Sequence, residues 1–292
     1  MDDPDLERRF GGLRRLYGMA GYSHLRRLCV AVVGLGGVGS WTVEALARSG
    51  VAQLVLVDFD HVSESNINRQ IQALGATVGQ SKAEALRDRI ADIHPGCAVQ
   101  IVDDFATPEN WPALLPGAVD VVVDACDQVL AKTAMTAWAV RERQAFVTVG
   151  AAGGKRAPQQ VRVDDLSLAT HDPLLASMRQ RLRKMHGAPR TGLMGVRCVY
   201  SAESVAKPSA VSTPAEVGEV APCEVMSEVT SEVRLEAPWD RAVGLQCAGY
   251  GSSVMVTATF GLVAAAQALE LGLRQASHFE PVINSKALRT GR

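Results

Sequence analysis

The sequence predicts an α/β fold built on a Rossmann-like, mostly parallel sheet flanked by helices. Two observations predict it. Apolar runs rich in β-branched residues alternate along the chain with helix-period segments, as buried parallel strands alternate with crossover helices. The first apolar run also ends in a glycine-rich turn, which is typical of nucleotide-binding folds of this class. With 292 residues, the chain is long enough for one domain with an elaboration.

The first strand–helix–strand unit, within residues 28–60, carries the strongest signal. Its parts are a strand at 29–33, the turn Gly34-Leu35-Gly36-Gly37-Val38-Gly39, a helix expected over 40–49, and a strand at 54–57 that ends at Asp58. A unit of this kind places phosphates on the N-terminus of its helix. The unit therefore predicts nucleotide binding, without yet distinguishing ATP from a dinucleotide.

The glycines of the turn have distinct expected roles. Gly34 permits the tight bend, Gly36 lets the backbone approach a pyrophosphate, and Gly39 lets helix and strand pack closely. Asp58 lies 19 residues after Gly39, where a carboxylate accepts hydrogen bonds from ribose hydroxyls.

The same periodicities predict the elements that follow. Further strands are expected over 99–102, 119–123, 145–149 and 159–163, and further helices over 82–94, 129–142 and 252–273, with a leading helix in the polar, basic arm 1–27. The last of these helices is nearly free of charge for about the length of a membrane span. It is nevertheless rich in Ala, Gly, Ser and Thr and contains Gln267 and Glu270, which favours a helix buried in a soluble core.

These elements give four parts. The arm 1–27 precedes a nucleotide-binding domain at 28–200, an insertion at 201–243 follows, and 244–292 completes the same domain with a glycine loop and the core helix. The insertion is rich in Pro, Ser, Thr and Glu, and no helical or strand period persists in it, so we expect it to be flexible.

Composition excludes several classes. Lys plus Arg (30) nearly balances Asp plus Glu (31), so no global field indicates a nucleic-acid partner, and no DNA partner is expected. The six cysteines, at positions 29, 97, 126, 198, 223 and 247, form no C-x-x-C pair, which argues against a zinc site and a disulfide framework. The N-terminus has no signal-peptide pattern, and a cytoplasmic location is expected.

A polar stretch follows the second strand, at the edge where open α/β sheets bind ligands. It includes Asp60, Ser65, Asn66, Asn68 and Arg69, and it is suited to holding polar groups. Downstream, Lys82 falls in the first turn of its helix, where a cation is unfavourable for the helix dipole. This lysine is therefore either indifferent surface or a phosphate ligand.

Two carboxylates, Asp124 and Asp127, follow the strand at 119–123. Beside a nucleotide they suit Mg²⁺, which binds through one or two carboxylates plus phosphate oxygens. The alternative is that Asp127 caps the helix over 129–142.

Two further features have open interpretations. Residues 179–197 contain six basic and no acidic residues, which indicates either a solvated face or contact with a phosphate backbone. Cys247 lies in a glycine-rich loop before the last helix, where it is either a nucleophile or a small packing residue. Cys223, inside the insertion, is a poor candidate for a catalyst.

The whole pattern resembles the ubiquitin-activating-enzyme-like adenylating family, which includes the molybdopterin- and thiamine-pathway activators. The matching motifs are the glycine turn, Asp58-Phe59-Asp60, the loop 65–69, Gly79-Gln80-Ser81-Lys82 and Asp124-x-x-Asp127. Within that family, the stretches 9–18, 68–71, 102–105, 172–174 and 256–261 resemble the tRNA threonylcarbamoyladenosine dehydratases. Members of the family bind ATP and Mg²⁺ and attach AMP to a carboxylate.

The resemblance implies roles for residues of this sequence. Asp58 falls on the ribose acid, Arg69 and Lys82 on the phosphate-handling cations, and Asp127 on the acid tied to Mg²⁺. The implied ATP-binding set is Gly34, Gly36, Gly37, Gly39, Asp58, Asp60, Ser65, Asn66, Asn68, Arg69, Lys82, Asp124 and Asp127, of which Arg69, Lys82 and Asp127 are catalytic. In the sulfur-carrier activators an arginine of the partner subunit also reaches ATP. Its position here is occupied by Gly12, which leaves Arg9 and Arg15 as substitutes.

The implied activity is an ATP-dependent dehydration that cyclises threonylcarbamoyladenosine beside the anticodon of a tRNA, through an acyl-adenylate. One alternative is an activator of a ubiquitin-like sulfur-carrier protein, against which the missing C-x-x-C pairs count. Another is a nicotinamide-dependent oxidoreductase or a non-catalytic nucleotide sensor, in which Arg69 and Lys82 have no evident role. The resemblance also implies a homodimer, and it leaves open a cysteine-desulfurase partner and a monovalent cation (Na⁺ or K⁺) at the loop 247–252.

Overall fold

A twisted, mostly parallel sheet forms the centre of the molecule. The computed structural model describes residues 5–206 and 250–274, and within them the sheet has seven strands in the order β3-β2-β1-β4-β5-β7-β6. The strands are β1 (Cys29–Val33), β2 (Gln53–Val57), β3 (Ala98–Val102), β4 (Val121–Asp124), β5 (Ala145–Val149), β6 (Val161–Asp165) and β7 (Arg197–Ser201). Strand β6 is antiparallel to β7, whereas the other pairs are parallel. The predicted fold class is confirmed.

The strand order reverses at β1, which pairs with β2 on one side and with β4 on the other. Open α/β sheets bind ligands in the crevice outside the carboxyl ends of the strands at such a reversal. The glycine turn follows β1 directly, so the topology places the predicted nucleotide site at this point.

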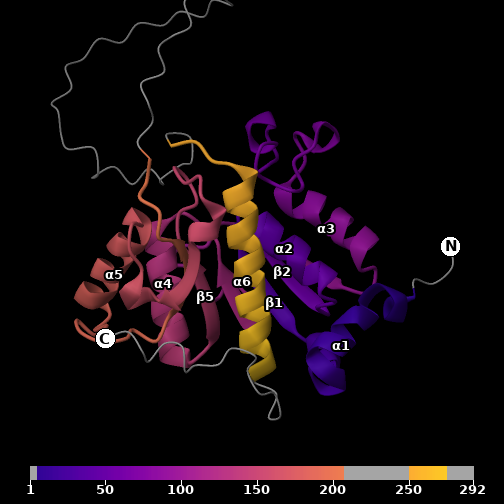
Figure 1. Ribbon diagram of the computed structural model, residues 1–292, viewed down its shortest axis with the longest axis horizontal. Helices are drawn as coiled ribbons and strands as arrows, with labels where there is room; N and C mark the ends of the chain where they lie inside the picture. Colours follow the sequence, from indigo (N-terminus) through magenta and orange to yellow (C-terminus); the bar gives the residue numbers. More distant parts are fainter. Residues whose placement is uncertain (1–4, 207–249, 275–292) are drawn as a thin grey trace, which may run out of the picture.

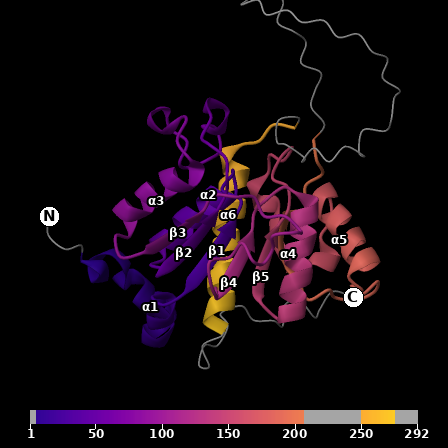
Figure 2. The same cartoon turned by 180° about the vertical axis from the view of Figure 1, so that it is seen from behind.

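Helices cover both faces of the sheet (Figures 1 and 2). They are α1 (Leu6–Leu25), α2 (Gly39–Arg48), α3 (Lys82–Ile93), α4 (Val129–Glu142), α5 (Pro173–Met185) and α6 (Val254–Arg274). Side chains of α2, α3 and α6 join one hydrophobic cluster with Val30 and Val32, while those of α4 and α5 join a second cluster with Ala31 and Val33. Successive residues of β1 thus serve opposite faces, as the alternation of a strand requires.

The last helix is confirmed as a core helix on one face. Val256, Phe260 and Ala264 of α6 are fully buried, and α6 packs on α2, β4 and β5. Its opposite face exposes Met255 and Leu262. The helix is long and apolar enough to cross a membrane, and half of its most apolar window is buried in the protein.

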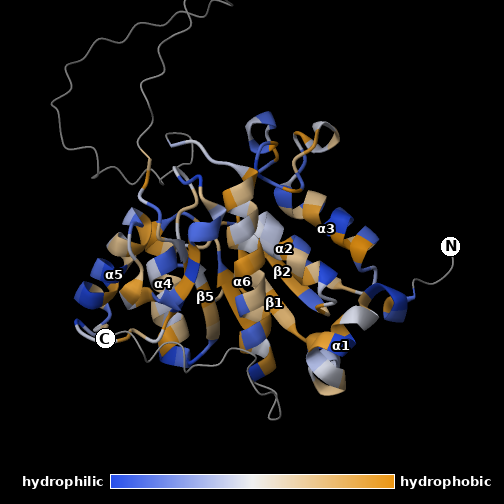
Figure 3. Cartoon of the chain, in the orientation of Figure 1, coloured by the Kyte–Doolittle hydropathy of each residue, from blue (hydrophilic) through white to orange (hydrophobic). Residues whose placement is uncertain are grey.

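Two elements were not predicted. The basic stretch after residue 172 contains α5, which buries Leu174, Leu175, Met178 and Leu182 against the sheet, and strand β7 follows it. Strand β7 ends at Ser201, and residues 207–243 of the predicted insertion lie outside the described residues. Figure 3 shows hydrophobic strands beneath helices that alternate between hydrophobic and hydrophilic residues.

Candidate nucleotide-binding site

The glycine turn is shaped by close backbone approaches. Gly34 has φ +87°, and an added Cβ there lies 2.8 Å from the amide nitrogen of Cys126. An added Cβ on Gly39 lies only 1.8 Å from the carbonyl oxygen of Gly34. Any larger residue at either position displaces backbone, so the tight bend and the close packing predicted for Gly34 and Gly39 are both present.

Gly36 differs from these two because it faces open space. A Cβ added there meets no atom within 4 Å. Helix α2 begins three residues later, and no side chain caps its first N–H groups. Uncapped N–H groups beside an open glycine form a cradle for an anion.

Asp58 stands at the carboxyl end of β2 beside the turn. Its Oδ2 accepts a hydrogen bond from the amide of Leu35 at 2.6 Å, and its Oδ1 accepts one from the amide of Asp60 at 2.8 Å. Burial raises the pKa of Asp58, and the Lys82 ammonium and these two amides act against it. Because two amides fix the carboxylate, it is held in place before any ribose arrives.

Arg69 lies across the turn. An added Cβ on Gly37 is 3.5 Å from Cδ of Arg69, so the arginine stem packs over that glycine. The guanidinium donates hydrogen bonds to the carbonyl of Ser65 and to Oδ1 of Asn68. The Arg69 head is therefore held by the polar loop itself, beside the cradle.

The polar loop divides into residues that build it and residues that remain exposed. Oδ1 of Asn66 accepts a hydrogen bond from the amide of Ser63, and the Asn66 side chain is buried, so this residue shapes the loop. Ser65 and Asn68 are exposed, and Nδ2 of Asn68 donates to the carbonyl of Ser252 just before α6. Ser65, Asn68 and Arg69 thus lie together on the accessible side of the loop next to the glycine turn, whereas Asn66 belongs to the loop's scaffold.

Lys82 and Asp60 form an ion pair. Nζ of Lys82 lies 2.7 Å from Oδ2 of Asp60; the lysine side chain is 8% exposed and the aspartate 54%. The backbone also connects them, since the amide of Lys82 donates to the carbonyl of Asp60. Lys82 is thus not an indifferent surface residue, because it is buried and its ammonium is paired with Asp60.

Asp124 does not lie where the sequence predicts. Its side chain is fully buried, its Oδ2 lies 2.8 Å from Nζ of Lys132 and accepts a hydrogen bond from Thr148, and its Oδ1 accepts one from the amide of Cys126. A carboxylate engaged in this way inside the protein has no free face for a ligand. We therefore remove Asp124 from the candidate nucleotide and Mg²⁺ residues and assign it to the interior.

Asp127, three residues further on, is exposed at the start of the β4–α4 loop. The N-cap of α4 is Gln128, without a side-chain capping bond, so Asp127 does not cap the helix. Partial desolvation by the neighbouring loops raises the pKa of Asp127, and the Asp60 carboxylate adds to this rise while Lys132 opposes it. A cation bound near the two carboxylates would relieve their repulsion.

Three residues that sequence reasoning missed hold these loops. Nε1 of Trp41 and Oγ1 of Thr257 both donate to the carbonyl of Arg69, at 3.0 and 3.2 Å. Lys132 donates to the carbonyls of Asp124 and Cys126, which fixes the start of the loop that carries Asp127. Thr257 lies in a stretch that carries the family resemblance, whereas Trp41 and Lys132 gave no signal.

The arm places its arginines differently from one another. Nη1 of Arg9 donates to the carbonyls of Asp92 and Ile93 and so caps the end of α3. Arg15 is exposed on α1. Of the two substitutes for the partner arginine, Arg9 is occupied within its own chain.

The described cysteines offer no nucleophile. All of them are free thiols, burial raises the pKa of Cys126, and burial likewise raises that of Cys198. Cys223 and Cys247 lie outside the described residues, as do residues 247–249 of the predicted cation loop.

Comparison with known proteins identifies the family and supports the fold. The ThiF family model matches residues 9–288. The tRNA threonylcarbamoyladenosine dehydratase of Escherichia coli K12 is 39% identical over 271 residues, 92% of this chain and 95% of that protein. That of Haemophilus influenzae is 36% identical over 93% of this chain and 95% of its own length. A crystal structure of the E. coli dehydratase with ATP is 35% identical, covers all of both chains and has a TM-score of 0.75, and one with AMP has a TM-score of 0.78 at 36% identity over 95% of this chain and 99% of that chain.

Proposed function

The chain belongs to the ThiF family, and on that premise we propose that it is an ATP-dependent tRNA threonylcarbamoyladenosine dehydratase. The observation that carries the proposal is the 39% identity with a dehydratase of that name over 92% of this chain. The local geometry supports it, because the open backbone at Gly36, the carboxylate of Asp58 and the cations Arg69 and Lys82 follow the strands at the reversal of strand order.

ATP binds with its phosphates at the turn. The open face of Gly36 and the uncapped start of α2 receive phosphate oxygens. Asp58 accepts hydrogen bonds from the ribose, while Arg69 and Lys82 approach the phosphates from the two loops. Because Asp60 holds Lys82 within 2.7 Å, we expect the nucleotide to compete with Asp60 for the ammonium.

The reaction begins with a carboxylate that is a poor electrophile, since its oxygen is a bad leaving group. An oxygen of the threonine carboxylate attacks the α-phosphorus of ATP, and the bond to the β-phosphate bridge breaks, which releases pyrophosphate. Arg69 and Lys82 stabilise the charge on the transferring group, as preorganised donors do. The product of this step is an acyl-adenylate.

Ring closure follows within the same molecule. The carbamoyl group attacks the activated carbonyl carbon, AMP leaves with the carboxyl oxygen, and a proton is lost, so the net change is removal of water. Effective molarity for well-oriented intramolecular reactions reaches about 10⁵ M or more. An enzyme cysteine is therefore unnecessary.

Mg²⁺ fits the residues present. Asp127 and Asp60 supply hard oxygen ligands from the loops after β4 and β2. These two carboxylates match the usual Mg²⁺ site, in which one or two carboxylates and phosphate oxygens hold the ion. The described residues contain no group of three or more metal-binding side chains. When bound, the ion stabilises negative charge on the phosphates.

Finer features belong to the same proposal. We expect a cytoplasmic homodimer in which Arg15, rather than Arg9, is the arm residue that approaches the partner's ATP. A monovalent cation at the loop 247–252 and a cysteine-desulfurase partner remain predictions.

The test is ATP–pyrophosphate exchange with purified protein. Exchange is expected with tRNA that carries threonylcarbamoyladenosine and not with the same tRNA lacking the modification, and mass analysis of the nucleosides should show loss of one water. Exchange that instead requires a carrier protein with a free C-terminus indicates the sulfur-carrier activator. Absence of exchange with the modified tRNA contradicts the proposed function.

A further inference from the structure

A basic groove runs along α5, outside the nucleotide site. It has a volume of about 550 Å³ and is lined by Ala176, Arg179, Gln180, Arg183, Lys184 and Arg190. All but Arg190 lie at helical spacing on one side of α5. Spacing of 1.5 Å per residue makes this stripe about 12 Å long.

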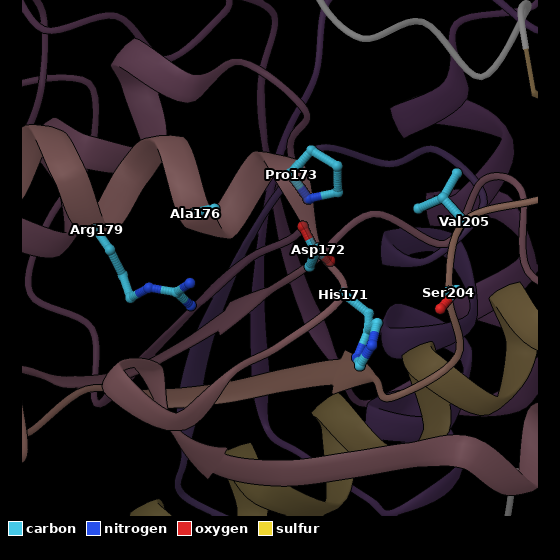
Figure 4. A pocket seen from close by; sticks show the side chains of 7 residues that line it. All are labelled: His171, Asp172, Pro173, Ala176, Arg179, Ser204 and Val205. Atoms are coloured by element: carbon cyan, nitrogen blue, oxygen red, sulfur yellow. The ribbon is translucent and has the colours of Figure 1, made fainter.

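A second hollow, of about 310 Å³, continues the groove at the start of α5 (Figure 4). The two share Ala176 and Arg179, and the second adds His171 and Ser204. They are therefore neighbouring parts of one surface, which we call the α5 groove.

The α5 groove begins at the edge of the sheet that carries the nucleotide site. Asp172, the N-cap of α5, accepts a hydrogen bond from the amide of Ala151, two residues after β5 ends. The carboxyl ends of parallel strands share one edge, so the start of α5 lies on the same edge as Gly36 and Asp127. From there α5 leads away from that edge.

The charge of the groove is unbalanced. Lys184 and Arg190 are exposed, and among the described residues no carboxylate forms an ion pair with Arg183, Lys184 or Arg190. The one acid in the lining, Asp172, is buried, and its two oxygens accept amides of Leu175 and Ala151. Lys184 and Arg190 thus face solvent without a carboxylate partner, while the half-buried Arg183 donates a hydrogen bond from Nε to the carbonyl of Pro189 and also has no carboxylate partner.

Other residues of the basic stretch 179–197 do have partners, so the unpaired charge of the groove does not follow from composition alone. Arg197 lies 3.3 Å from Glu270 and donates to Oε1 of Gln267, so α6 neutralises it inside the fold. Arg179 also donates to the carbonyls of Leu166 and Ala169, which anchors it at the inner end of the groove. The unpaired charges are those on the outer part of the stripe.

We propose that the α5 groove binds the sugar–phosphate backbone of the substrate RNA and so presents the modified adenosine to the ATP site. The proposal rests on the proposed function, which supplies an RNA substrate. A row of cations that no carboxylate neutralises fits a chain of phosphates, which carries one negative charge per nucleotide.

The experiment neutralises the three outer cations together, as R183Q, K184Q and R190Q. Arg179 is left intact because of its hydrogen bonds within the fold. The matched control removes three charges at the opposite edge of the sheet, as R27Q, R48Q and R141Q. Binding of unmodified tRNA is measured against salt concentration, and turnover of modified tRNA is measured in parallel.

The groove variant should bind tRNA on the order of tenfold more weakly, and the slope of log affinity against log salt should fall by roughly 2 to 3. The KM for tRNA should rise, with the KM for ATP and the turnover at saturating tRNA unchanged. The control should retain the wild-type slope.

Two results overturn the inference, and they are distinguishable. If wild-type protein is active and the groove variant binds and processes tRNA like wild type, the docking site is elsewhere and the proposed function stands. If wild-type protein processes no modified tRNA, the proposed function fails and the docking inference fails with it.

Discussion

Strands β2 and β4 lie on either side of β1, and at the carboxyl end of each an aspartate pairs with a lysine of the α-helix that follows, at nearly the same distance. Lys82 and Asp60 are 2.7 Å apart, and Lys132 and Asp124 are 2.8 Å apart. The first pair leaves its aspartate 54% exposed, whereas both side chains of the second pair are 0% exposed. Water therefore reaches one pair and not the other.

This difference separates a pair that a ligand can open from a pair that must stay closed. Breaking the exposed pair leaves Asp60 in water, which costs little. Breaking the buried pair leaves an uncompensated charge inside the protein, which costs several kcal/mol. Burial lowers the pKa of Lys132, but the Asp124 carboxylate outweighs it and the net direction is upward. The β4 loop thus carries Asp127 on a rigid base, while the β2 loop keeps its cation available.

The largest effect is expected from breaking the buried pair. Lys132→Met should lower the free energy of unfolding by about 3 to 5 kcal/mol, because Asp124 remains buried without its partner. Urea unfolding followed by circular dichroism measures it. Adding Asp124→Asn to the same chain should recover part of the loss, since the isolated charge is then removed. A loss below about 1 kcal/mol for the single variant contradicts the assigned role.

The next largest effect is expected on the turnover number, with little change in the free energy of unfolding. Arg69→Ala should lower the turnover number by about 10² to 10³, because a donor to the transferring phosphate is lost. The unfolding free energy should change by about 0.5 kcal/mol or less, as the guanidinium lies at the surface of the loop. Single-turnover kinetics with modified tRNA measures the loss of activity, and urea unfolding measures the change in stability.

Arg87→Ala is the matched control for that prediction. Arg87 is an equally polar surface arginine on α3, paired with Glu84 and Asp88. It should retain wild-type turnover. If Arg69→Ala remains near wild-type activity, the phosphate role of Arg69 is wrong.

Opening the exposed pair should have a smaller effect on stability. Lys82→Ala should cost roughly 1 kcal/mol or less of unfolding free energy, in contrast to Lys132→Met. It should also weaken ATP binding by about tenfold or more, since a charge-assisted contact with phosphate is lost. Isothermal titration calorimetry with ATP measures the affinity. Asp60→Ala should destabilise more than Lys82→Ala, because it leaves the largely buried Lys82 ammonium without its partner. Equal stability losses for Lys82→Ala and Lys132→Met remove the distinction between the pairs.

The contrast also shows what a sequence can and cannot predict here. Helix 129–142 and strand 145–149 were predicted at the bounds that the structure has, because the spacing of hydrophobic residues is a local property of the sequence. Asp124 and Asp127 look alike in sequence, three residues apart at one strand end. Their difference depends on Lys132 and Thr148, which reach Asp124 from a helix and a neighbouring strand, and such tertiary contacts leave no local pattern.

The sequence did not predict helix α5, for a different reason. Its buried residues Leu174, Leu175, Met178 and Leu182 have helical spacing, but the basic residues between them dominated the interpretation. In the sequence the basic residues form one continuous stretch, whereas in the structure they lie on different faces of the protein. Arg197 then pairs with α6 while Arg183 and Lys184 line the α5 groove.

The smallest effect tests Asp58, which directly follows β2. Burial raises the pKa of Asp58 in the folded protein. Between its unfolded and folded pKa values the folded state holds a proton that the unfolded state has released, so stability falls as pH rises through that window and stays lower at neutral pH. Asp58→Asn removes the titration. Its unfolding free energy relative to wild type should therefore increase from acid to neutral pH, although its affinity for ATP should fall. Urea unfolding at a series of pH values measures the difference, with Asp103→Asn, an exposed aspartate after β3, as the control. A difference that shrinks as pH rises contradicts the account, whereas the expected increase shows that this carboxylate is retained for its ligand at a cost to the fold.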